Sequence, residues 1–480
     1  MSMLDVLIIG AGLSGIGAAR HLQAQCPGKT WRIWEARAQM GGTWDLFRYP
    51  GVRSDSDMHT LGYSFKPWRG EQAMADGPSI LQYIQEAAQE TGVAQQIAYG
   101  HRVVSASWSS DVACWTITAC LADGTQVQQR AKFLYLCGGY YSYTQGHQPH
   151  FEGQEHFKGD LVHPQFWPEG LSHAGQRVVV VGSGATAITL VPAMAATAAH
   201  VTLLQRSPSY VVSRPARDHL ALWLDCWLPS SVAYALARWK NILQGLLYFQ
   251  LARRQPEFFK NYLVKMVSQA LRGKVDVARH FTPRYKPWDQ RVCAVPDGDL
   301  FKQINQGRVS VVTDTISHFT SDGLMLQSGE VLPADIVVMA TGLQLNVLAD
   351  VAFEVDGQTL VAGQRFAYKG MMLSGVPNMA MAFGYTNASW TLKADLTAGF
   401  VCRLFKHMDA KGYRFVCPQT DGPLQPEPFL DFSSGYVVRA TERLPKQGPT
   451  SPWRVHQNYV LDLLALRFGR LEDGVLHFSP

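Results

Sequence analysis

A glycine-rich turn near the start of this chain has the residue types and spacing that suit a dinucleotide. The apolar run Val6–Ile9 leads into Gly10, Gly12 and Gly15, and a small-residue helical pattern follows. Glycine at 10 and 12 lets the backbone turn tightly beside a pyrophosphate, and the helix N-terminus offers free N–H groups. Gly15 lets the helix pack on the strand. The glycine turn alone is weak evidence for a dinucleotide site. Here a predicted strand precedes it and a predicted helix follows it, as in a dinucleotide-binding unit.

The next predicted strand, Trp31–Glu35, ends in an acid. A carboxylate at this point can accept hydrogen bonds from both hydroxyls of a ribose, and it would repel a 2′-phosphate. The first site therefore favours FAD or NAD over NADP. The residues predicted to bind the cofactor in this unit are Gly10, Gly12, Ser14, Gly15 and Glu35.

A second unit of the same kind begins at the predicted strand Arg177–Val181. Its following strand, His200–Arg206, ends in an arginine that is followed by Ser207, so a guanidinium and a hydroxyl stand where the first unit has an acid. Arginine stays charged near neutral pH and can bind a 2′-phosphate, so this site favours NADPH. An ordinary surface arginine is the alternative interpretation of Arg206. The residues predicted to bind NADPH are Gly182, Ser183, Gly184, Ala185, Thr186, Arg206 and Ser207.

Two dinucleotide units in one chain indicate a flavoprotein that a diffusible nicotinamide reduces. The eight cysteines include no CxxC pair, which argues against a dithiol as the acceptor of the flavin's electrons. No His/Cys spacing suits zinc, so no metal site is predicted. The flavin must then pass its electrons to another acceptor.

Two further segments resemble the class B flavoprotein monooxygenases, and within them the Baeyer–Villiger monooxygenases. Residues 157–168 match the FxGxxxHxxxW(P/D) fingerprint of that group, whose N- and S-oxygenating relatives usually carry Tyr or Phe at the tryptophan position. Residues 41–55 are similar to the GGTW…RYPG…D segment that packs on the flavin in the family. The fingerprint residues are Phe157, Gly159, His163 and Trp167, and the flavin segment adds Gly42, Thr43, Trp44, Asp45 and Asp55.

Three blocks, 62–68, 287–291 and 384–396, are similar to the bacterial monooxygenases that activate the thioamide drug ethionamide. The last block also resembles the N- and S-oxygenating relatives, so the preference between ketone and heteroatom stays open. The resemblance places the active-site arginine at Arg291 and the carboxylate that orients it at Asp55. A fixed cation beside the flavin favours the deprotonated, nucleophilic form of flavin-bound oxygen, which attacks a carbonyl.

Several of these side chains could have a structural role instead of a catalytic one. Arg291 and Asp55 could instead be a surface arginine and a strand-end acid with no contact. We expect His163 to dock the two lobes and not to carry protons, although histidine titrates near neutral pH. Three tyrosines that follow a predicted strand are treated as packing: Tyr140, Tyr141 and Tyr143.

The expected function is NADPH- and O2-dependent insertion of one oxygen atom next to a ketone carbonyl, giving an ester or lactone, with oxidation of sulfides as a second activity. The partners are a small-molecule ketone or sulfide and O2. One alternative is an N- or S-oxygenating flavin monooxygenase. Another is a flavin-dependent NADPH reductase or a non-catalytic nucleotide-binding protein, against which the matched Arg291 and Asp55 argue.

The elements that must position these residues predict an α/β fold with two Rossmann-like domains. The expected FAD-binding domain combines residues 1–143 and 343–480, and the NADPH-binding domain spans 144–342 with a helical insertion at about 215–275. With 480 residues, 47% of them hydrophobic, the chain can bury large cores, and the length predicts two or three domains.

The remaining composition limits the partners and the location. Lys and Arg exceed Asp and Glu by only five charges, which are spread along the chain and disfavour nucleic acid as a partner. Charged residues and a proline interrupt the apolar insertion, so we expect it to line a pocket and not to span a membrane. Contact with a membrane surface stays open as an alternative, although the sequence does not support it. The default location is cytoplasmic. The sequence does not determine the oligomeric state.

Overall fold

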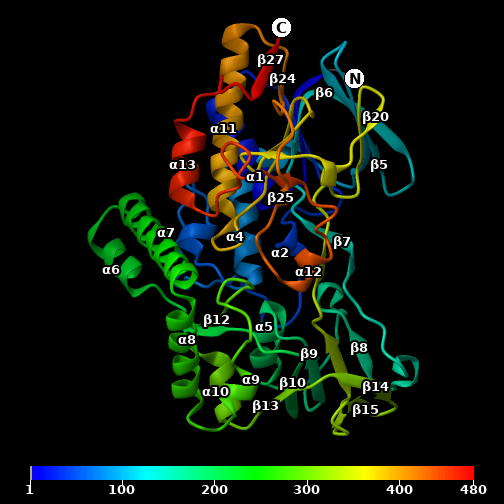
Figure 1. Cartoon of the computed structure of the whole chain (residues 1–480), viewed down its shortest axis with the longest axis vertical. Coiled ribbons are helices and arrows are strands. Elements are labelled where there is room, and N and C mark those ends of the chain that lie inside the picture. Colours follow the sequence, from blue (N-terminus) through cyan, green and yellow to red (C-terminus); the bar gives the residue numbers. More distant parts are fainter. Residues whose placement is uncertain (1–2) are drawn as a thin grey trace.

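The computed structural model describes residues 3–480 and contains two large β-sheets, each at the centre of its own lobe (Figure 1). The first sheet has the order β20-β19-β4-β5-β6-β1-β2-β3, and β23 also pairs with β6. Its strands come from both ends of the chain: β1 (Leu4–Ile9), β2 (Trp31–Trp34), β3 (Ile97–Ala98), β4 (Arg102–Ser109), β5 (Cys114–Cys120), β6 (Gln126–Leu136), β19 (Ala352–Val355), β20 (Gln358–Thr359) and β23 (Met379–Met381).

The parallel centre of the first sheet decides where a site can form. Strand β1 lies between β2 and β6, with Ile9 opposite both Trp34 and Leu136. Val6 and Ile8 face one hydrophobic core, and the alternate side chains of β1 face a second core across the sheet. Because the strands are parallel, their carboxyl ends meet at one edge, where the following loops converge.

Helices α1 (Leu13–Gln25) and α11 (Trp390–Lys411) pack side by side on one face of this sheet. The Nε2 atom of His21 on α1 lies 3.3 Å from Oδ1 of Asp395 on α11. The smaller elements of this lobe are α2 (Thr43–Leu46), α3 (Met58–Leu61), α4 (Gly77–Glu90), η1 (Val93–Gln96), η4 (Ala362–Gln364), β21 (Ala367–Tyr368), β22 (Met372–Leu373), β24 (Phe415–Pro418), β25 (Glu427–Pro428), α12 (Gly435–Val438), β26 (Lys446–Gln447), α13 (Tyr459–Arg467) and β27 (Leu476–Ser479).

The second sheet is parallel throughout, in the order β13-β10-β9-β17-β8. With two such sheets flanked by helices, the predicted α/β fold is confirmed. The elements of this lobe are η2 (Gln154–His156), β8 (Asp160–Val162), η3 (Pro164–Phe166), β9 (Arg177–Val181), α5 (Ala185–Met194), β10 (His200–Gln205), β11 (Val211–Arg214), α9 (Val277–His280), β12 (Cys293–Pro296), α10 (Asp299–Asn305), β13 (Val309–Thr313), β14 (Ile316–Thr320), β15 (Gly323–Leu326), β16 (Val331–Pro333) and β17 (Ile336–Met339).

The chain crosses between the lobes twice, and the two crossings lie side by side. Strand β7 (Tyr141–Gly146) leaves the first lobe and pairs antiparallel with β18 (Leu343–Leu345), which returns to it. These strands contain the expected boundaries at 143/144 and 342/343. The exact division into domains stays a prediction.

A helical segment projects from the second lobe toward the first (Figure 1). It consists of α6 (His219–Trp227), α7 (Ser230–Arg254) and α8 (Pro256–Leu271). The buried Arg238 of α7 fixes its position, because Nη1 donates hydrogen bonds to the carbonyl oxygens of His59 at 2.8 Å and Gly62 at 2.7 Å. Its Nη2 lies 3.6 Å from Oδ2 of Asp395. The segment is therefore anchored on the first lobe by a buried cation.

Across residues 3–480, none of the helices combines the length and the hydropathy needed to cross a bilayer.

Candidate functional site

A cavity of about 430 Å³ opens at the carboxyl edge of the first sheet. Gly10, Gly12, Ser14 and Glu35 line it, as predicted for the first dinucleotide unit. Helix α1 begins beside it with Gly12 as N-cap, and neither a capping side chain nor an acid occupies its first turn. The free N–H groups and positive dipole end of α1 therefore suit a pyrophosphate.

The glycines of the turn have distinct roles. Gly10 has φ +101°, and a Cβ there would lie 2.8 Å from the carbonyl oxygen of Cys137. Gly15 does not line the cavity, but a Cβ there would lie 1.9 Å from the carbonyl oxygen of Gly10. Gly15 thus allows α1 to pack on the turn, as its position predicted, while Gly12 leaves the cavity wall open.

The carboxylate of Glu35 is buried at the edge of this cavity. Its Oε2 accepts a hydrogen bond from the backbone N–H of Ala11 at 2.7 Å, and its Oε1 accepts one from the backbone N–H of Arg37 at 2.9 Å. Burial raises the pKa of Glu35, and the two backbone hydrogen bonds only partly oppose this shift. Each oxygen keeps a lone pair that can accept from a hydroxyl of a bound ligand.

Only part of the segment at the start of α2 lines the first cavity. Gly42, Thr43 and Trp44 line the cavity as predicted. Asp45 does not, because its buried carboxylate binds two arginines: Arg37 Nη2 at 2.5 Å and Arg48 Nη2 at 2.8 Å. Arg37 itself lines the cavity. Asp45 therefore positions a cation of the cavity wall instead of facing the cavity.

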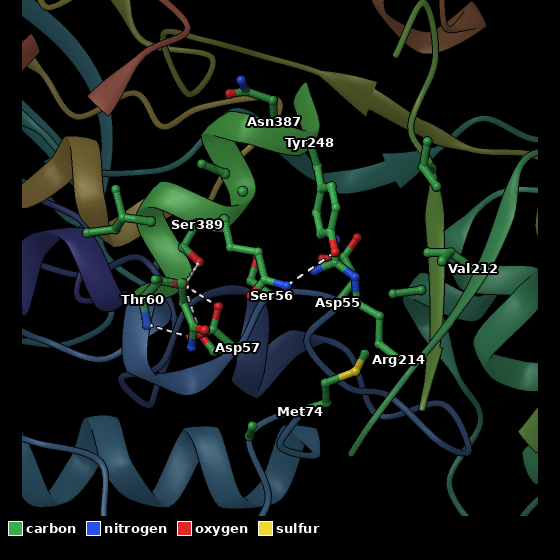
Figure 2. Close-up of a pocket in the computed structure, with 18 of the residues that line it drawn as sticks. Asp55, Ser56, Asp57, Thr60, Met74, Val212, Arg214, Tyr248, Asn387 and Ser389 are labelled. Carbon is green, nitrogen blue, oxygen red and sulfur yellow. Dashed lines mark hydrogen bonds between the residues drawn. The ribbon is translucent and has the colours of Figure 1, made fainter. Parts of the chain in front are cut away.

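A second cavity, of about 470 Å³, lies between the first lobe, the second lobe and the helical segment. Its polar side includes Asp57, Thr60 and Ser389, and Figure 2 shows them facing Val212 and Tyr248 across the cavity. Among the residues that line both cavities are Asp55, Ser56, Arg291, Ala294 and Ala388. The two cavities thus share a wall.

Arg291 and Asp55 meet on this shared wall. Nη1 of Arg291 donates a hydrogen bond to Oδ2 of Asp55 at 3.4 Å, and the exposed fractions of the two side chains are 31% and 34%. Burial opposes the charge of Arg291, but the nearby Tyr140, Asp55 and Tyr436 overcome that effect and raise its pKa well above the ordinary value. The guanidinium is therefore a permanent cation whose free surface faces the cavities.

Three aromatic side chains that were expected to serve only as packing line the first cavity, and two of them, Tyr140 and Tyr141, lie near this cation. Tyr140, Tyr141 and Tyr143 all line the first cavity, which corrects the prediction. The ring of Tyr140 stacks on Trp390 with centroids 4.9 Å apart, and Nε1 of Trp390 donates to Oγ of Ser14 at 2.7 Å. Their place directly after β6, at the edge where the site forms, was the signal that could have found these tyrosines.

Burial raises the pKa of Tyr436, and the nearby positive charge of Arg291 partly opposes that rise. This tyrosine belongs to α12, far from the sequence motifs. Nothing in the pattern around residue 436 indicates this contact, because only the return of the chain to the first lobe creates it.

The second dinucleotide unit forms at the carboxyl edge of the second sheet. Gly182 has φ +141°, and α5 begins after Gly184, which has open space where a Cβ would lie. Arg206 and Ser207 follow β10 and are exposed, and Arg206 has no hydrogen-bond or ion-pair partner within residues 3–480. Ser183 accepts a hydrogen bond from Ser209 at 3.1 Å. Ala185 and Thr186 reach across the interface and line the first cavity.

The fingerprint residues belong to the connection between the lobes. The ring of His163 packs against both crossings: Nε2 is 3.4 Å from the carbonyl oxygen of Gly342, and a Cβ on Gly146 would lie 2.1 Å from the ring. Burial lowers the pKa of His163, which favours its neutral form. None of Phe157, Gly159, His163 and Trp167 lines either cavity. Their positions support the predicted docking role.

Comparisons with known proteins agree with this site. A family model described as "Flavin-binding monooxygenase-like" matches residues 5–406. The chain is 50% identical over 478 residues to FAD-containing monooxygenase EthA of Mycobacterium tuberculosis (strain ATCC 25618 / H37Rv), covering 99% of this chain and 98% of that protein.

Solved structures with the same fold include two monooxygenases. An oxidized steroid monooxygenase bound to NADP is 25% identical, with a TM-score of 0.71 and 88% of each chain covered. A cyclohexanone monooxygenase with bound epsilon-caprolactone has a TM-score of 0.76 at 20% identity, over 99% of this chain and 100% of that one.

Proposed function

Because this chain belongs to the flavin-binding monooxygenase-like family, we propose that it inserts one atom of O2 next to a ketone carbonyl to give an ester or lactone. The predicted family is confirmed, and the protein is a flavin monooxygenase. The single observation that carries the Baeyer–Villiger reaction is the Arg291–Asp55 pair on the wall between the two cavities.

FAD and NADPH are the cofactors, as predicted. The first cavity fits FAD, because it combines an uncapped helix N-terminus, a turn closed to side chains at Gly10 and a buried acid. Gly12 and the N-terminus of α1 would hold the pyrophosphate, and Glu35 would accept hydrogen bonds from a ribose. Trp44, Tyr140 and Trp390 line the same cavity and would supply aromatic walls around a bound flavin.

The second unit fits NADPH. Gly184 leaves space where a pyrophosphate approaches α5, and the unpaired Arg206 with Ser207 stands where a 2′-phosphate would lie. Ala185 and Thr186 line the first cavity as well, so the start of α5 faces both cofactor sites. The second unit would therefore hold NADPH next to the wall of the flavin cavity.

When bound and reduced by NADPH, FAD supplies the electrons that activate O2. Arg291 supplies a fixed positive charge that stabilises negative charge developing on oxygen at the shared wall. Asp55 is a positioning residue, because its carboxylate holds the guanidinium against that wall without neutralising its free N–H groups. The cation also orients a carbonyl that approaches from the second cavity.

The second cavity is the proposed ketone site. It borders the flavin cavity at Arg291, and its apolar side is formed by Val212, Leu246, Phe259 and Trp288. Polar groups gather on the opposite side around Asp57 and Thr60. This arrangement favours an apolar ketone of limited size, with its carbonyl directed toward the cation.

Replacement of Arg291 tests the proposal. Arg291→Ala should keep FAD bound, because the glycine turn, the N-terminus of α1 and Glu35 are unchanged, while ester formation falls by about a thousandfold. Arg291→Lys is the matched control, since it keeps a cation but not the planar fork, and should recover part of the rate. If Arg291→Ala made ester at the parental rate, the assignment would be wrong.

A competition experiment separates the proposed reaction from heteroatom oxidation. A ketone and a thioether are offered together to the holoenzyme with NADPH and O2, and both products are quantified. Ester or lactone as the main product supports the proposal. Sulfoxide without ester would favour the N- or S-oxygenating alternative, and NADPH consumption independent of O2 would indicate a reductase.

A further inference from the structure

One side of the molecule carries an unusual concentration of exposed apolar side chains. Helices α6, α7 and α13 lie along the same side in Figure 1. More than half of the large hydrophobic side chains exposed within residues 3–480 belong to these helices or to the residue after α13. They are called the apolar face below: Leu220, Leu222, Trp223, Trp227, Val232, Leu236, Trp239, Leu243, Leu247, Leu461, Leu464 and Phe468.

Helix α7 is apolar on two opposite sides. Its exposed large residues recur every three or four positions from 232 to 247, which places them on one side of the helix. Ala233, Ala237 and Ile242 are buried on the other side, against the first lobe. The buried Arg238 fixes this orientation. The outward apolar stripe therefore cannot turn inward, and no part of the described chain covers it.

Indole rings dominate the outer surface of the face. The exposed fractions of Trp223, Trp227 and Trp239 are 58%, 74% and 41%. The ring of Trp239 lies 5.9 Å from that of Tyr459, which joins the α7 stripe to α13. Tryptophan prefers the boundary between lipid tails and headgroups, because its ring is apolar while its N–H can reach water or a headgroup.

Three exposed arginines lie at the margin of the face, with the exposed acids Glu257 and Glu472 nearby in the chain. Arg254 ends α7, and Arg467 and Arg470 lie at the end of α13; none has an ion-pair partner in the part of the chain that the structure describes. The one exposed acid on α6, α7 and α13, within that part, is Asp225. The three guanidinium groups are therefore available to a negatively charged partner. Anionic headgroups would compensate them.

We propose that the apolar face docks on an anionic lipid surface, with α6, α7 and α13 lying in the interface. Helix α7 also lines the second cavity through Asn241, Gly245 and Leu246, so docking would bring that cavity next to the bilayer. The role of this cavity as the ketone site rests on the proposed function. The lipid contact does not.

Flotation of the holoenzyme with vesicles tests the proposal. Vesicles of equal parts phosphatidylcholine and phosphatidylglycerol should carry the protein upward in a density gradient, and pure phosphatidylcholine should carry less of it. If wild-type protein floated with neither, the proposal would be overturned. Turnover of a short, water-soluble ketone without vesicles is measured in parallel, so a failed lipid contact is distinguished from a failed oxygenation.

Three of the most exposed residues of the face give the decisive variant. Trp227→Gln, Leu243→Gln and Leu247→Gln together should weaken binding to mixed vesicles at least about tenfold, while soluble-ketone turnover is kept. The matched control is Val112→Gln with Val331→Gln, two exposed apolar residues outside the face. Equal loss of binding in the control, or full binding by the triple variant, would overturn the proposal.

The charged margin has its own test, which does not disturb the apolar packing. Arg467→Gln with Arg470→Gln should weaken binding to mixed vesicles by about fivefold per arginine and leave binding to phosphatidylcholine unchanged. Light scattering without lipid measures the mass in solution. A dimer that dissociates in the triple variant, with no flotation of wild-type protein, would show that a second copy occupies the face.

Discussion

The two dinucleotide units of this protein share a local fold but differ in what surrounds them. In the first unit, Glu35 is buried, and residues 138–144, 291 and 343–351 also close in on the cavity. In the second unit, Arg206 and Ser207 stand exposed at the end of β10, without a partner for the guanidinium in residues 3–480. The same strand-turn-helix motif thus borders a cavity in the first unit and an exposed surface in the second.

This difference matches the two tasks of a flavin monooxygenase. An enclosed cofactor is retained over many turnovers, because its dissociation requires the surrounding segments to move. An exposed site allows NADPH to bind, donate a hydride and leave as NADP. Burial also explains the opposite charges of the two units. A buried acid can be stabilised by hydrogen bonds from ribose hydroxyls, whereas an exposed guanidinium can bind a doubly charged phosphate.

The largest expected contrast lies in the glycines of the two turns. Gly15→Ala should destabilise the protein by about 3 kcal/mol or more and lower its FAD content, because the new Cβ would lie 1.9 Å from a backbone oxygen. Gly184→Ala should change the unfolding free energy by less than about 1 kcal/mol, since its Cβ meets open space. Thermal unfolding and flavin absorbance measure both effects. Equal destabilisation would contradict the difference between the units.

The exposed cation should discriminate between the two nicotinamide cofactors. Arg206→Ala should raise the KM for NADPH by roughly ten- to a hundredfold and that for NADH by much less, because only NADPH carries the 2′-phosphate. Steady-state kinetics with both cofactors check this. Gly184→Ala serves as a control, since obstruction of the pyrophosphate should affect both cofactors alike.

The buried acid of the first unit should give a pH-dependent effect on the apoprotein. The folded-state pKa of Glu35 is raised by burial, so its contribution to stability is greatest at low pH and is lost as the pH rises through that pKa. The Tm of the Glu35→Gln apoprotein relative to wild type should therefore rise from low pH to pH 7, while the variant, whose amide cannot accept both backbone hydrogen bonds, binds FAD more weakly. A Tm difference independent of pH would refute this account.

The smallest expected effect comes from an exposed acid of the second lobe, and it has the opposite sign. Asp335 Oδ1 lies 2.6 Å from Arg177 Nη2, and that hydrogen bond lowers the pKa of Asp335 to about 2. Its contribution is therefore present at pH 7 and is lost as the pH falls from about 4 toward 2. Asp335→Asn should lower the Tm only slightly, because exposed ion pairs contribute little. A loss larger than that of Gly15→Ala would contradict this ranking.

Some site residues escaped prediction because their partners are distant in the chain. Asp45 has the motif position of a cavity residue, yet Arg37 and Arg48 bind its carboxylate away from the cavity. Tyr436 reaches Arg291 only because the C-terminal part returns to the first lobe. Helix α7 belongs to the insertion that was expected to line a pocket, and it does so through Gly245 and Leu246. Its division into an inner and an outer apolar side appears only when the lobe that covers the inner side is present.

The sequence by itself determined both dinucleotide units and their charge preferences, because each depends on contacts within a strand, a turn and a helix that follow one another directly. The tertiary structure alone decided where the chemistry is placed. Asp55 and Arg291 are 236 positions apart, and they meet because two crossings between the lobes bring the edges of the two sheets together. Such a contact depends on the relative position of whole sheets, which no local spacing of residues specifies.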